Sequence, residues 1–64
     1  MRMMIDQYED LLKRAVELED DLLKLLQLPQ EYATRRPLET ALDSMGDVVG
    51  DIGWIIDVLK VHTQ

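Results

Sequence analysis

Three aspartates, Asp43, Asp47 and Asp51, are the residues of this sequence whose type and spacing best suit chemistry. They recur every four residues, which aligns them along one face of a helix. Carboxylates in such a row are able to bind a divalent cation, which prefers oxygen ligands, or a basic protein partner. A solvated helix face has the same pattern, although like charges at this spacing destabilise a helix slightly. All three interpretations of this acidic face stay open.

Three glycines, Gly46, Gly50 and Gly53, lie among these aspartates. On a helix of about 100° per residue they share one narrow strip. Small residues at this spacing allow the backbone of another helix to approach closely, and glycine also permits a helix to bend. A phosphate-binding loop requires a preceding strand and a following Lys or Arg, and this sequence has neither. The glycines therefore predict close packing or a bend.

Directly after the glycines, Trp54, Val58 and Val61 form a second apolar stripe on the outer helix face. Tryptophan is enriched at binding hot spots of protein interfaces. A helix that is apolar nearly all round is covered on all sides. We therefore expect residues 54–61 to be enclosed in a homo-oligomer or to dock another protein.

The stretch SMGDVV resembles the E-L-G-D-V pattern of MazG-like nucleotide pyrophosphohydrolases in Gly46, Asp47 and Val48. That resemblance implies a helical bundle in which acidic residues on facing helices hold magnesium. It covers six of the 64 residues, and the glutamate of the pattern is Ser44 here. The partner pattern E-x-x-E is present only as ELED at residues 17–20. A MazG-like fragment is thus the remote alternative for the function.

Other catalytic groups are scarce. The chain has no cysteine, and its single histidine, His62, is two residues from the end of the sequence. A covalent nucleophile needs a base within reach, and no pair of residues here suggests one. We expect no catalytic residue, no metal site and no cofactor, and hence no enzyme.

Two regular apolar patterns must position these residues. Each advances by alternate steps of four and three, the spacing of a coiled-coil seam. The first seam consists of Met4, Tyr8, Leu11, Ala15, Leu18, Leu22 and Leu25. The second consists of Leu38, Leu42, Met45, Val49, Ile52, Ile56 and Leu59. Pro29 and Pro37 bracket the connection, and proline disfavours helix in the residue before it. The sequence predicts an all-α antiparallel hairpin with helices over about 4–27 and 37–61.

Both helices carry more apolar residues than one seam needs. A half-circumference apolar arc is typical of a helix that contacts two or more neighbours. We therefore predict that the hairpin dimerises into a four-helix bundle. The residues expected at this interface or at a partner surface are Gly46, Gly50, Gly53, Trp54, Ile55, Val58, Val61, Leu12, Leu23 and Val48.

Length and charge narrow the class of protein further. Sixty-four residues form one domain with a marginal core, and without cysteine the remaining means of stabilisation is oligomerisation. The net charge of −6 disfavours nucleic acid and anionic membranes as partners, since these require a basic surface. No signal peptide or membrane span is recognisable. A cytoplasmic location is expected.

These observations favour a small acidic protein–protein interaction module. It would act as a regulator, adaptor or inhibitor of one larger protein, as phage-encoded inhibitors and antitoxins do, an analogy at the level of class only. The alternative is a purely structural unit of a homo-oligomeric assembly. Loss of a partner on changing Trp54 or Val58, with the chain still folded, would favour the first.

Overall fold

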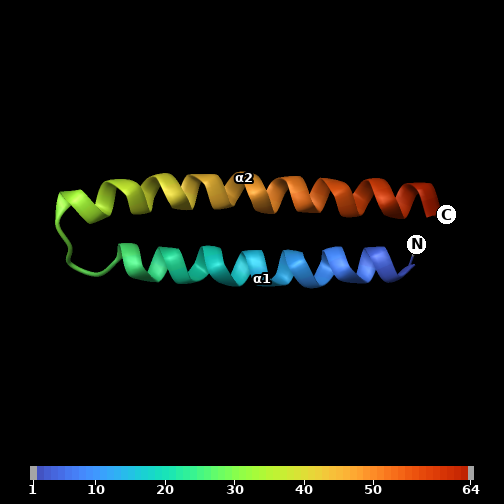
Figure 1. Ribbon diagram of the computed structural model, residues 1–64, viewed down its shortest axis with the longest axis horizontal. Helices are drawn as coiled ribbons and strands as arrows, with labels where there is room; N and C mark the ends of the chain where they lie inside the picture. Colours follow the sequence, from blue (N-terminus) through green and yellow to red (C-terminus); the bar gives the residue numbers. More distant parts are fainter. Residues whose placement is uncertain (1, 64) are drawn as a thin grey trace.

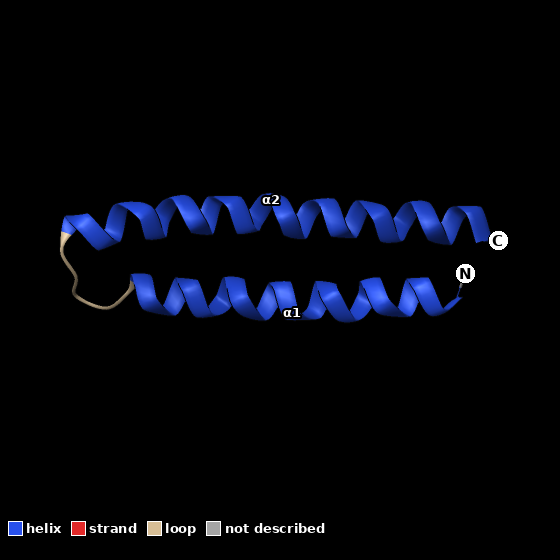
Figure 2. Cartoon of the chain, in the orientation of Figure 1, coloured by secondary structure: helices blue, strands red, loops and turns tan. Residues whose placement is uncertain are grey.

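The protein is an antiparallel pair of helices joined at one end (Figure 1). The computed structural model describes residues 2–63, with side chains for residues 3–62. Helix α1 spans Arg2–Leu26 and helix α2 spans Tyr32–Thr63. Everything described outside residues 27–31 is helical (Figure 2). The hairpin measures 50 × 14 × 11 Å. The prediction of an all-α helical hairpin is confirmed.

The start of α2 differs from the prediction. It begins at Tyr32, five residues before Pro37, which lies inside the helix. Proline has no N–H to donate to the carbonyl four residues earlier, here that of Ala33. Because Ala33 is exposed, water is able to satisfy this carbonyl, so one lost hydrogen bond does not end the helix. The sequence rule for residues preceding proline was wrong at this position.

Side chains from the connection and from the first turn of α2 cap the end of α1. The Gln30 side-chain amide donates to the Leu25 carbonyl at 2.9 Å, and the Arg35 guanidinium donates to the Leu26 carbonyl at 3.4 Å. The last carbonyls of a helix lack partners within it and carry partial negative charge. Arg35 therefore supplies both a donor and a favourable charge at the end of α1.

The core lies between the two helices and is small. Within the described residues its buried members are Ala15, Ile52 and Ile56. The half-buried residues packed against them are Tyr8, Leu12, Met45 and Val49. Every residue of the predicted seam on α2 is buried or half-buried. The apolar spacing therefore located the inner face of α2 correctly.

The inner face of α1 is rotated from the predicted one. Tyr8, Ala15 and Leu22 face α2 as expected, but the residues that alternate with them are Ile5, Leu12, Glu19 and Leu26. The seam residues that the sequence predicted in their place are all exposed, and they are Met4, Leu11, Leu18 and Leu25. Apolar residues are adjacent in pairs along α1, so two seams one residue apart satisfy the same spacing. The structure uses the second.

Candidate interaction surfaces

An ion pair defines the register of the hairpin. The Lys60 ammonium lies 3.5 Å from the Glu9 carboxylate across the two helices. Seven residues make about two turns of a helix. In an antiparallel pair, the residue seven positions after Glu9 on α1 and the residue seven positions before Lys60 on α2 therefore lie beside each other on the same side of the hairpin. Val16 then lies level with Gly53, and Leu23 with Gly46. The rows that contain these residues form one side of the hairpin. Each helix has a second row on the other flank of its inner face, and these two rows meet on the other side of the hairpin.

On the side away from this ion pair, seven apolar residues lie in two adjacent rows, one of which continues to His62, and we call it the apolar side. It consists of Met4, Leu11, Leu18 and Leu25 of α1 and Ala41, Val48 and Ile55 of α2. All are exposed except Ile55, which is half-buried. Leu18 is 49% exposed although it lies in the middle of α1. A continuous apolar face of this kind marks an association site.

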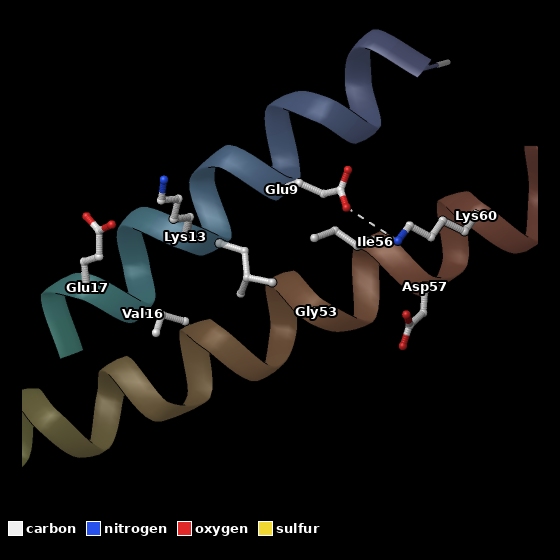
Figure 3. Close-up of a pocket in the computed structure, with 9 residues that line it drawn as sticks. Glu9, Lys13, Val16, Glu17, Gly53, Ile56, Asp57 and Lys60 are labelled. Carbon is white, nitrogen blue, oxygen red and sulfur yellow. Dashed lines mark ion pairs between the residues drawn. The ribbon is translucent and has the colours of Figure 1, made fainter. Parts of the chain in front are cut away.

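The side with the ion pair contains Glu9, Val16, Leu23, Gly46, Gly53 and Lys60, and we call it the glycine side. A groove of about 580 Å³ opens here, with Leu12, Val16, Gly53 and Ile56 among its lining residues. Figure 3 shows Glu9 reaching Lys60 beside this groove and Val16 extending from α1 toward α2. The groove exists because glycine places no side chain opposite Val16.

The glycines do not bring the two helices of the hairpin together. A Cβ atom added at Gly50 or Gly53 would meet nothing within 4 Å. At Gly46 it would lie 3.7 Å from a carboxylate oxygen of Glu19, an ordinary van der Waals distance. Helix α2 also continues without interruption through all three positions. Neither close packing within the chain nor a break in the helix accounts for the glycines.

The outer surface of α2 carries the stripe predicted from Trp54, Val58 and Val61. Trp54 is 69% exposed and Val61 is 72% exposed, while Val58 is half-buried between them. Together with Asp57 and His62 they line a shallow pocket of about 240 Å³. The chain itself leaves this stripe uncovered, so the expectation that residues 54–61 are enclosed requires a second molecule.

The acidic residues singled out in the sequence lie mainly on exposed surfaces of the helices. Asp43, Asp47 and Asp51 are exposed, as is Glu17 of the ELED stretch on α1. Within residues 3–62, no three histidine, aspartate or glutamate side chains come close enough to hold a metal ion together. The helices face each other mainly through apolar residues, whereas the MazG-like resemblance implies facing carboxylates.

Nine of the ten predicted interface residues therefore occupy three different surfaces. Val48 and Ile55 lie on the apolar side, and Leu23, Gly46 and Gly53 lie on the glycine side. Trp54, Val58 and Val61 lie on the outer surface of α2, with Gly50 near it. Leu12 packs against the hairpin core instead.

Ala41 of the apolar side was not among the predicted interface residues, and four other members were assigned to the wrong face. They are Met4, Leu11, Leu18 and Leu25, which the sequence assigned to the inner seam. Their uniform spacing of seven, with no charged member, was the available signal. The row that replaces them inside the hairpin contains Glu19, so charge alone would have favoured the wrong choice for an isolated hairpin.

Comparisons of the chain with protein-family models, curated proteins and solved structures find no match. Among the described residues, neither helix is both long enough and apolar enough to cross a bilayer. The function must therefore be argued from the surfaces themselves.

Proposed function

We propose that this protein is a protein–protein interaction module that works as a homodimer. The apolar sides of two hairpins pack together and form a four-helix bundle. The observation that carries this proposal is a set of seven apolar residues, six of them exposed, in two adjacent rows without a charged member. Helices in such bundles pack at about 20° through rows of this kind.

The choice of inner seam on α1 supports the proposal. An isolated hairpin would be more stable with Leu18 buried and Glu19 exposed. In the structure, Glu19 is half-buried and Leu18 is exposed. The arrangement becomes favourable when a second molecule covers Leu18 and the other members of its row. Burying a leucine side chain contributes about 1.5–3 kcal/mol.

The small core supports it as well. Only three of the described residues are buried, and a chain of 64 residues without disulfides usually needs oligomerisation for stability. The covering of the apolar side supplies the missing apolar contacts.

The dimer would present the outer surface of α2 to one larger protein, as a regulator, adaptor or inhibitor. Trp54 and Val61 point away from both the seam and the apolar side, so dimerisation leaves them accessible. This part of the proposal rests on their exposure and on the enrichment of tryptophan at binding hot spots.

The alternative is a structural assembly unit, and the groove on the glycine side favours it. A hairpin that binds copies through two different sides would extend into larger assemblies. The two alternatives differ in the mass of the purified protein.

Light scattering of the purified chain tests the proposal. A helical hairpin of 7.4 kDa is expected to give twice this mass at micromolar concentration. A folded monomer at that concentration contradicts the homodimer. A mass that keeps growing with concentration favours the assembly unit.

A further inference from the structure

We infer that the outer surface of α2 binds a basic amphipathic helix of another protein. This inference deepens the proposed function by naming the chemistry of the partner, and it rests on that function. The apolar contact surface is the stripe of Trp54, Val58 and Val61 with its shallow pocket. An apolar side chain of a helical partner fits such a pocket, in the manner of helix-in-groove recognition.

The charges around the stripe define the partner. Residues 38–59 of α2 include five carboxylates and no lysine or arginine. The carboxylates of Asp47, Asp51 and Asp57 flank Trp54 along the helix and are all exposed. Lysine or arginine side chains beside an apolar stripe would complement both features of this surface.

The outer face of α1 differs from that of α2 because basic residues are interspersed with its carboxylates. On α1 the Arg14 side chain lies 3.2 Å from Asp10, and Lys24 lies 3.0 Å from Asp20. Two carboxylates of that helix are thus paired, although α1 as a whole has seven acidic and four basic residues. Residues 38–59 of α2 contain no lysine or arginine interspersed with their carboxylates, so the negative field of this segment is available to a second molecule.

The same charges argue against other occupants of this surface. Two copies joined through their outer α2 surfaces would bring aspartates together, and nucleic acid or anionic lipid would be repelled. The apolar side, which carries no charge, is suited to a second copy. The outer surface of α2 is suited to a basic partner.

Trp54 provides a direct readout, because it is the only tryptophan of the chain. The probe is a synthetic amphipathic helix of leucine and lysine, with a leucine–glutamate helix as its control. We expect the leucine–lysine peptide to shift Trp54 emission to the blue in a saturable manner, and to bind more weakly as salt screens the charges. The acidic peptide should leave the emission unchanged.

Matched variants distinguish binding at the outer surface of α2 from non-specific binding of a basic peptide to an acidic protein. The triple change Asp47→Asn, Asp51→Asn and Asp57→Asn should weaken peptide binding by roughly tenfold or more. The same charge change on α1, through Asp6→Asn, Glu17→Gln and Asp21→Asn, should weaken it much less. Val61→Gln should weaken binding while Val16→Gln on the glycine side should not. Circular dichroism verifies that each variant is folded.

The inference is overturned if the wild-type dimer gives no emission shift, if both triple variants lose affinity equally, or if the acidic peptide binds as well. Failure of the homodimer is seen separately by light scattering. A monomer that still binds the leucine–lysine peptide through Val61 would support this inference and contradict the dimer alone.

Discussion

The two sides of the hairpin are built from the same two helices, yet they differ in chemistry. The apolar side has seven apolar residues and no charge. The glycine side pairs Val16 and Leu23 with glycines and carries the Glu9–Lys60 ion pair near one end. Both sides flank the same core at equivalent helical positions. We propose that the difference arises because a second copy covers only the apolar side.

The difference between the two sides gives a reason for association to end at the dimer. A two-fold dimer uses the same surface of each copy and closes on itself. Charged residues beside an apolar face discourage additional association, and Glu9, Lys60 and Asp57 all lie at the groove on the glycine side. One apolar and one partly charged side would thus favour a dimer over an extending assembly.

The largest expected effect comes from removing the core that both sides share. Ile56 is 5% exposed and packs between the helices. Ile56→Ala should destabilise the protein by about 2–4 kcal/mol, through lost apolar burial and the cavity left behind. Chemical denaturation followed by circular dichroism measures this loss. Val61→Ala, at an exposed position, is the control and should change stability by less than about 0.5 kcal/mol.

Substitution of the glycines tests whether the glycine side is left uncovered in the dimer. Gly50→Ala and Gly53→Ala place a methyl group in open space, and alanine is favoured over glycine in a helix by about 1 kcal/mol. Each variant should therefore be more stable than the wild type and remain a dimer. Thermal unfolding and light scattering on the same samples measure both properties.

The opposite result would reassign the interface. If Gly53→Ala weakened dimerisation, another backbone must approach the glycine side closely, as small residues permit. The copies would then associate through the glycine side, and the apolar side would need a different partner.

The smallest expected effect concerns an exposed ion pair on α1, between Asp20 and Lys24. The hydrogen bond and charge of Asp20, with the charge of Asp21, raise the pKa of the Lys24 ammonium. A raised pKa in the folded state stabilises it below the lysine pKa, and this contribution is lost as pH rises through the folded value. Because the pair is exposed, the change in stability should be very small.

Asp20→Asn should lower the pKa of Lys24 toward its ordinary value, as measured by a nuclear magnetic resonance titration of the lysine side chain. Asp10→Asn, which removes a carboxylate paired with Arg14, is the control and should leave Lys24 unchanged. An unchanged Lys24 in Asp20→Asn would show that the pair does not persist in solution.

The sequence predicted the helices and the inner face of α2, because one row of apolar residues on that helix is clearly preferred. It misassigned α1, since the adjacent pairs Met4–Ile5, Leu11–Leu12 and Leu25–Leu26 allow two seams. Periodicity alone does not say which of two apolar rows contacts which neighbour. Only the register set by the partner helix decides this.

The first residue of α2 and the surroundings of the glycines were also not predictable from the sequence. A local rule for Pro37 did not account for an exposed carbonyl that water is able to satisfy. The glycines share a strip, as predicted, but their position opposite Val16 and Leu23 depends on the alignment of α1 with α2. That alignment is a tertiary property, seen in the Glu9–Lys60 pair.

Sedimentation equilibrium of Leu18→Glu and Leu23→Glu tests the central claim most directly. The two leucines lie on the same helix and are similarly exposed in the hairpin, at 49% and 43%, but on opposite sides. The homodimer proposed here predicts that Leu18→Glu, which places a charge in the covered apolar side, abolishes the dimer. It predicts that Leu23→Glu remains dimeric. Loss of the dimer in Leu23→Glu with its retention in Leu18→Glu would contradict the account.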